Sequence, residues 1–137
     1  MNMERFLVAQ ERDYEIALSE IRSGRKKSHW MWYIFPQIQG LGYSSMAQFY
    51  AIKDSEEAIA YLQHSVLGTR LIEITEALLC LKENDAIKVM GYPDDLKLRS
   101  SMTLFYAVSN IDVFKAVLDK FFCGEMDIKT LDILKTK

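Results

Sequence analysis

Residues 28–46 have the sequence SHWMWYIFPQIQGLGYSSM, and they differ from the rest of the chain, most of which has the periodicity of amphipathic helices. The stretch contains both tryptophans, and its aromatic block runs directly into a glycine turn that two serines follow. Residues 30–36 are apolar on every side before Pro36, so periodicity does not decide between a short buried helix and a short buried strand. Pro36 favours extended geometry at Phe35 and ends the element. We expect the rest of the chain to pack around this stretch.

Helical patterns lie on both sides of residues 28–46. On the N-terminal side, residues 4–23 place apolar side chains at spacings of three and four, and Gly24 is a natural stop. On the C-terminal side, cap residues and apolar periodicity predict further helices that end at turn residues. Their expected ranges are 45–50, 55–63, 66–82, 85–90, 93–108, 113–122 and 128–135.

No segment alternates apolar and polar residues as a half-buried strand does, and glycine and proline are scarce, at 6 and 2 residues. A chain of 137 residues is of the size of one domain. The loops are short, which favours consecutive helices that pack as neighbours. We therefore predict an all-α fold, in which residues 1–137 form a single compact domain of about seven helices without internal repeats.

The composition excludes several classes of function. The net charge of −2 comes from 17 basic and 19 acidic residues, which is not the footprint of a duplex-binding protein, so we expect no nucleic-acid partner. No apolar run is long enough for a membrane span and no secretory signal is present, so we expect a cytoplasmic protein with free thiols at Cys80 and Cys123. Two histidines and two scattered cysteines have no zinc spacing, and we expect no metal and no cofactor. Self-association stays open.

The aromatic block allows two interpretations. As a binding surface, Trp30, Trp32 and Tyr33 would stack against a ring-bearing ligand, while His29 and Gln37 would orient it. As a core element, the same side chains would fill the centre of the helical array. The two are compatible, because a buried aromatic block can also form the wall of a pocket.

The glycine turn also has two interpretations. A turn through Gly40 and Gly42 that feeds a helix capped by Ser44 or Ser45 can direct backbone N–H groups at a phosphate or carboxylate. It can equally be an ordinary N-cap turn, since neither the dinucleotide fingerprint nor a P-loop is present. Likewise, the cations at residues 25–27 could face such an anion or lie at a solvated helix end.

A second dense stretch, residues 93–103, carries acids, bases and three hydroxyl groups on one predicted helix. Mid-helix hydroxyls lower helix propensity, so they indicate either a polar face towards a ligand or close packing between helices. His64, between two helices, is either a helix-end group or an acid–base group. The candidates from these segments are the ligand-binding residues Lys97, Arg99, Ser100 and Ser101, and the catalytic residues His29, His64, Asp94 and Asp95.

The chain resembles the bacterial family named domain of unknown function 1810. The resemblance lies in the runs SHWMWYIFPQIQGLGYSS, AIAYLQHSVLGTRL and DDLKLRSSMTLF and extends to the opening and closing segments. Ser65 departs from it, because a proline is expected after the histidine. The resemblance implies a small α-helical bacterial domain with no assigned activity. The label calpastatin-like, sometimes attached to such sequences, has no support here, because calpain inhibition needs a disordered, aromatic-poor chain.

Two functions follow as hypotheses. The first is a small-molecule-binding domain with a polar and aromatic cleft for an anionic, nucleotide-like ligand. If it catalyses a reaction, we expect a hydrolysis such as cleavage of an N-glycosidic bond, with a histidine and an aspartate as acid and base. The alternative is a protein-interaction or self-associating module without catalysis. The first hypothesis requires the stretches 28–46 and 93–103 to meet around a cleft.

Overall fold

The computed structural model describes residues 1–136, and these residues form nine α-helices and no strand. The all-α fold class is confirmed, and the helix count is slightly higher than expected, because residues 31–34, which the sequence leaves undecided, form a short helix beside the other expected ranges. The helices are α1 (Glu4–Arg22), α2 (Met31–Ile34), α3 (Ser45–Tyr50), α4 (Ser55–Gln63), α5 (Leu67–Leu79), α6 (Ala86–Met90), α7 (Asp94–Ser109), α8 (Asp112–Phe122) and α9 (Ile128–Thr136).

Side-chain caps fix the starts of three of the helices. Ser44, Asp54 and Asp85 each accept a hydrogen bond from a backbone N–H group in the first turn of α3, α4 and α6. The sequence predicts Pro93 as the first residue of α7. In the structure α7 begins one residue later, at Asp94, and Pro93 flanks it. Capping chemistry in the sequence therefore locates helix starts to within a residue.

One helix end differs from the prediction by more than a residue. Helix α5 ends at Leu79 rather than near residue 82, because the Lys120 ammonium of α8 donates to the carbonyl oxygens of Leu78, Leu79 and Leu81 and closes the last turn. Helix α8 ends at Phe122 as expected, and Cys123 after it takes the left-handed conformation, with φ of 54°. The difference at α5 depends on a residue about 40 positions away, which local sequence does not reveal.

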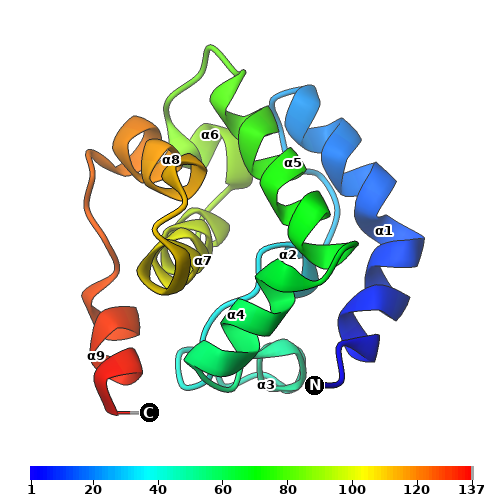
Figure 1. The fold of residues 1–137 in the computed structure, drawn as a ribbon. Helices are drawn as coiled ribbons and strands as arrows, with labels where there is room; N and C mark the ends of the chain where they lie inside the picture. The colour runs from blue at the N-terminus through cyan, green and yellow to red at the C-terminus, as the bar shows by residue number, and fades with distance from the viewer. Residues whose placement is uncertain (137) are drawn as a thin grey trace.

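Helix α7 is central to the packing. It contacts α4, α6, α8 and α9, while α1 packs on α5 and α2, and α5 on α8 (Figure 1). A series of rings crosses the core, with centroid distances of 5.1 Å for Phe6 and Tyr61, 5.4 Å for Tyr61 and Phe105, and 5.9 Å for Phe105 and Phe114. These rings, on α1, α4, α7 and α8, join helices that are distant in the sequence into one core.

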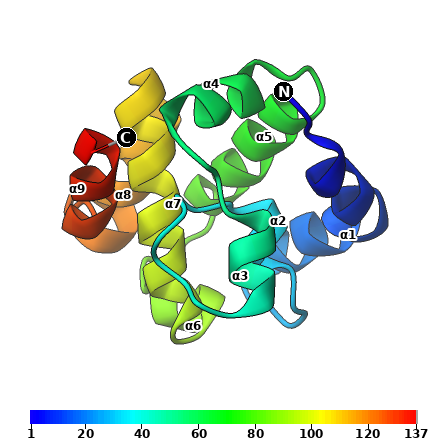
Figure 2. The same cartoon turned by 90° about the horizontal axis from the view of Figure 1, so that it is seen from below.

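The element at residues 30–36, which the sequence leaves undecided, is a single helical turn followed by extended chain. Trp30, Tyr33 and Phe35 are at most 1% exposed, so most of the aromatic block is core. Beyond Pro36, Ile38 forms an isolated parallel bridge with Ile52. Figure 2 shows α2 and α3 close to α7 on one side of the molecule. The bridge brings the glycine turn to that side.

Helices α4 and α5 meet very closely at their junction. A Cβ atom on Gly68 would lie 2.0 Å from the carbonyl oxygen of Leu62, so only glycine fits there. Among residues 1–136, no helix is long and apolar enough to cross a membrane.

Candidate functional site

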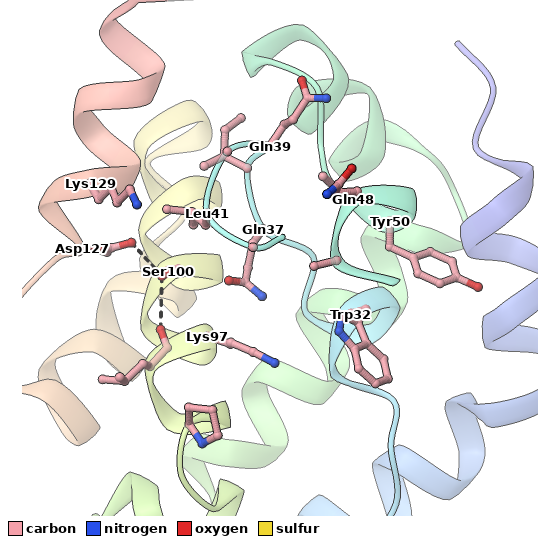
Figure 3. Close-up of a pocket in the computed structure, with 17 residues that line it drawn as sticks. Trp32, Gln37, Gln39, Leu41, Gln48, Tyr50, Lys97, Ser100, Asp127 and Lys129 are labelled. Carbon is pink, nitrogen blue, oxygen red and sulfur yellow. Dashed lines mark hydrogen bonds between the residues drawn. The ribbon is translucent and has the colours of Figure 1, made fainter. Parts of the chain in front are cut away.

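A pocket of about 260 Å³ lies between the 32–51 region and helix α7 (Figure 3). One wall comes from Trp32, the chain after Pro36 and helix α3, and the other from α7 and the start of α9. The two stretches that the sequence singles out therefore meet around a cleft. The lining residues are Trp32, Gln37, Ile38, Gln39, Gly40, Leu41, Gly42, Ala47, Gln48, Tyr50, Ala51, Pro93, Leu96, Lys97, Ser100, Asp127 and Lys129.

The first wall is positioned by two backbone hydrogen bonds. Gln39 N–H donates to the Ile52 carbonyl and Ile52 N–H donates to the Gln37 carbonyl, each at 2.8 Å. Ile38 and Ile52 are buried, so this bridge fixes the chain on the core. The Gln37 side chain projects into the pocket, where it makes no hydrogen bond with any residue from 1 to 136 (Figure 3).

The second wall is one face of α7. Pro93, Leu96, Lys97 and Ser100 are three or four residues apart and therefore share a side of the helix. The Ser100 hydroxyl donates to the Asp127 carboxylate at 2.7 Å and also lies 3.2 Å from the Leu96 carbonyl oxygen. The mid-helix hydroxyl of Ser100 thus belongs both to the pocket and to helix packing.

Asp127 caps α9 and fastens it to α7. Its carboxylate accepts from Ser100 and from the Thr130 hydroxyl at 2.6 Å, and its N–H donates to the Thr103 hydroxyl at 2.9 Å. Burial raises the pKa of Asp127, but the hydrogen bonds from Ser100 and Thr130 and the charge of Arg99 outweigh it and hold the pKa below its usual value. The pocket is therefore bordered by an ionised carboxylate at neutral pH.

Lys97 brings a positive charge to the aromatic wall. Its Nζ lies 5.7 Å from the ring centroid of Trp32, and 3.5 Å from Asp94 Oδ1. Asp94 also pairs with Lys26, whose Nζ is 3.0 Å from Oδ2. One carboxylate thus faces two ammonium groups, which leaves a net positive charge beside Trp32.

Trp30 and Tyr33, by contrast, are structural. The Trp30 indole donates to Glu20 at 2.9 Å, and the Tyr33 hydroxyl contacts the Asp13 carboxylate. Burial raises the pKa of Glu20, but hydrogen bonds from the Ser28 hydroxyl, the N–H groups of Lys27 and Ser28, and the Trp30 indole outweigh it and lower the pKa to about 2. Of the two tryptophans, only Trp32 lines the pocket.

None of the four predicted catalytic residues lines the pocket, within the part of the chain that the structure describes. His29 is exposed, and the ring Nδ1 of His64 accepts from the N–H groups of Val66 and Leu67 at the start of α5. The Asp94 carboxylate is engaged in an ion pair with Lys97, and Asp95 is buried, with 6% of its surface exposed. These side chains do not form one acid–base pair around the cleft.

The remaining predicted binding residues divide in the same way. Gly40 and Gly42 line the pocket, whereas Ser44 caps α3 through the Ala47 N–H and Ser45 is an exposed first-turn residue. The serines thus form an ordinary N-cap turn. Arg99 faces Glu125, with 4.0 Å between Nη1 and Oε2, and Ser101 is completely buried in the core. Neither of the two lines the pocket.

Several pocket residues were not predicted from the sequence. Gln48, Asp127 and Lys129 belong to segments whose local pattern indicates only a helix or its cap. Asp127 directly precedes α9, as a cap residue does, but nothing local shows that it faces the glycine turn. A partial signal existed for Gln39 and Gln48, because both are long amides close to Gly40 and Gly42.

The fold is all-α, with this pocket between the 32–51 region and α7, and comparison with known proteins gives its family. The model of the family described as "Protein of unknown function (DUF1810)" matches residues 1–134, and the chain belongs to that family. The resemblance in the sequence is confirmed. The conserved hypothetical protein Rv1873 from Mycobacterium tuberculosis, known from a crystal structure at 1.38 Å, is 44% identical with a TM-score of 0.96, over 98% of this chain and 96% of that one. No curated protein matches the chain.

Proposed function

We propose that the pocket binds a small anionic molecule that carries a planar ring, such as a mononucleotide. The observation that carries this proposal is the position of Lys97, whose Nζ lies 5.7 Å from the ring centroid of Trp32 at the same pocket. A cation and an aromatic face side by side can bind the two halves of such a ligand. The charge of the ligand would meet Lys97, and its ring would stack on Trp32.

The charges around the pocket favour an anion. Among residues 1–136, the charged residues that line it are Lys97, Lys129 and one carboxylate, that of Asp127. That carboxylate already accepts hydrogen bonds from Ser100 and Thr130, and Asp94 divides its charge between Lys97 and Lys26. The ammonium groups are therefore only partly neutralised within the protein.

The size and the amide groups favour a small polar ring. A pocket of about 260 Å³ is near the lower end of the range for ligand sites, which suits a mononucleotide or something smaller. The Gln37 amide offers both donors and an acceptor to the edge of a heteroaromatic ring. Trp32 is half-buried, so its ring can be covered by a ligand without unfolding the core.

The proposal is one of binding, without a reaction. The acid–base candidates His29, His64, Asp94 and Asp95 lie outside the pocket lining. Asp127, which borders the pocket, has a lowered pKa and is a poor proton donor near neutral pH. A hydrolytic step has no support from these groups.

The alternative is a protein-interaction or self-associating module, and the exposed apolar surface available for it lies on and beside α3. Most of the aromatic block is buried, but Tyr43, Met46 and Phe49 are 79%, 39% and 59% exposed on and beside α3. Size-exclusion chromatography over a range of protein concentrations tests this alternative. An elution volume that depends on concentration, and no longer does so in Phe49→Ser, would favour it over ligand binding.

The binding proposal is tested by thermal-shift screening with nucleoside monophosphates, the matching nucleosides and inorganic phosphate as separate probes. A ligand at 100 times its Kd adds about 2.7 kcal/mol to the free energy of unfolding, which is a shift of several degrees. We expect stabilisation by a nucleoside monophosphate, lost in Lys97→Met and kept in Arg99→Met. The two residues are on the same helix and carry the same charge, but only Lys97 lines the pocket. Equal loss in both variants would contradict the proposal.

A further inference from the structure

Residues 39–51 leave the core and return to it at a single point. The parallel bridge between Ile38 and Ile52 closes this loop, with both isoleucines at most 1% exposed. A surface loop of this length whose ends are held together is an Ω-type loop, a kind of loop that often carries function. The neck is therefore fixed on the core while the loop itself lies outside it.

Between the two ends, few contacts fasten the loop to the rest of the protein: Leu41 packs partly on the core, and a Cβ on Gly40 would lie 3.3 Å from the Ile133 side chain. No side chain of residues 39–51 is buried, and α3 is a helix without a buried residue. Every hydrogen bond that the structure describes for residues 40–50 stays within that segment. Gln48 Nε2 donates to the Tyr43 carbonyl at 2.7 Å, and Ala47 N–H donates to the Ser44 hydroxyl at 3.1 Å. Such a segment is cohesive internally and can open locally as one unit.

The two ends of this segment differ in their anchoring. At the C-terminal end, the Tyr50 ring packs on Tyr33 and Phe6 with centroid distances of 5.0 and 6.1 Å, and the carbonyl of Ala51 accepts from Arg5 at 3.0 Å. At the N-terminal end, Gly40 has a φ of +109°, which other residues rarely adopt. The chain can therefore turn at Gly40 and just before Tyr50.

We propose that residues 40–49 form a lid that opens as a unit and controls access to the pocket. The lid contributes Gly40, Leu41, Gly42, Ala47 and Gln48 to one wall, opposite α7 (Figure 3). The opposite wall belongs to α7, which is buried against its neighbouring helices, so opening has to come from the lid side. This inference rests on the proposed function only in that the pocket is taken as a binding site, because the opening itself is a property of the free protein.

Hydrogen exchange of the free protein tests the local opening with a matched pair of amides. Gln48 N–H donates to the Ser44 carbonyl at 3.0 Å in α3, and Val89 N–H donates to the Asp85 carbonyl at 3.3 Å in α6. Both helices are short and capped, but α6 has buried residues and α3 has none. We expect the Gln48 amide to exchange at least about 100-fold faster, at a rate that low urea leaves unchanged. Equal rates, or a Gln48 rate that rises with urea as that of Val89 does, would overturn the proposal.

Quenching of Trp32 fluorescence by acrylamide tests whether the lid covers the pocket. A Cβ atom on Gly42 would lie 2.6 Å from the Cβ of Ala47, so Gly42→Ala prevents the lid from folding onto itself. We expect the quenching constant of Trp32 to rise about two-fold or more in this variant, with Trp32→Phe giving the Trp30 background. Gly24→Ala is the control, because an added Cβ there meets no atom within 4 Å, while its φ of +90° imposes a backbone strain that Gly42→Ala does not. Quenching in Gly42→Ala equal to that in the control would overturn the lid. Because no ligand is used in either experiment, a failed ligand screen would affect the proposed function and leave the lid standing.

Discussion

Lys26 Nζ lies 3.0 Å from Asp94 Oδ2, and this ion pair joins the loop that precedes the aromatic block to the first turn of α7. The Lys26 side chain is only 7% exposed and also lies 4.9 Å from the ring centroid of Trp30. A single buried cation thus connects the two segments that form the opposite walls of the pocket.

We predict that Lys26→Met destabilises the protein by about 2–4 kcal/mol, because it leaves a partly buried carboxylate with fewer partners. Lys27→Met is the matched control, since the Lys27 side chain is exposed, and it should change the free energy of unfolding by less than about 0.5 kcal/mol. Urea denaturation measures both. Equal effects of the two substitutions would show that the ion pair does not hold the walls together.

Glu20 makes the stability of the folded protein depend on pH in the acid range. Its pKa is about 2 in the folded protein, whereas an unfolded glutamate has a pKa of about 4.3. A depressed folded-state pKa stabilises the protein fully above the unfolded value, and this stabilisation is lost as the pH falls through the window from about 4.3 to about 2. We expect the Tm of Glu20→Gln to fall less steeply than that of the native protein across this window. Parallel Tm curves would contradict the role of Glu20.

Gly68 makes the contact between α4 and α5 possible. A Cβ at this position would lie 2.0 Å from a backbone oxygen, which cannot rotate away as a side chain could. We predict that Gly68→Ala costs about 3 kcal/mol or more, at the upper end of overpacking effects. Thr69→Ala, on the exposed side of the same turn, should cost less than about 0.5 kcal/mol. Chemical denaturation that gives a small effect for Gly68→Ala would mean that the junction can widen.

The helical fold was predictable because its signals are local. Apolar periodicity located α1 and α5, and cap residues such as Asp54 and Asp85 located helix starts within a residue. The bridge between Ile38 and Ile52 was not predictable, because a bridge of one residue pair leaves no periodic pattern in the sequence.

The site was predictable only in outline. Sequence reasoning singled out both walls, but it could not separate Trp30, which is turned to Glu20, from Trp32, which lines the pocket. The same holds for Lys97 and Arg99, two residues apart on α7. These distinctions depend on which face of an element meets which neighbour, and that is set by tertiary packing.

The two tryptophans provide the most direct test of the binding proposal. In a ¹⁵N–¹H spectrum the chain has two indole N–H signals, one from buried Trp30 and one from Trp32 at the pocket, and Trp32→Phe assigns them. Titration with the nucleoside monophosphates should move the Trp32 signal and leave the Trp30 signal in place. The apparent affinity from this titration should be at least about 10-fold weaker in Lys97→Met, which removes a charge-assisted contact. A Trp32 signal that no nucleoside monophosphate moves, or that moves equally well in Lys97→Met, would contradict the account.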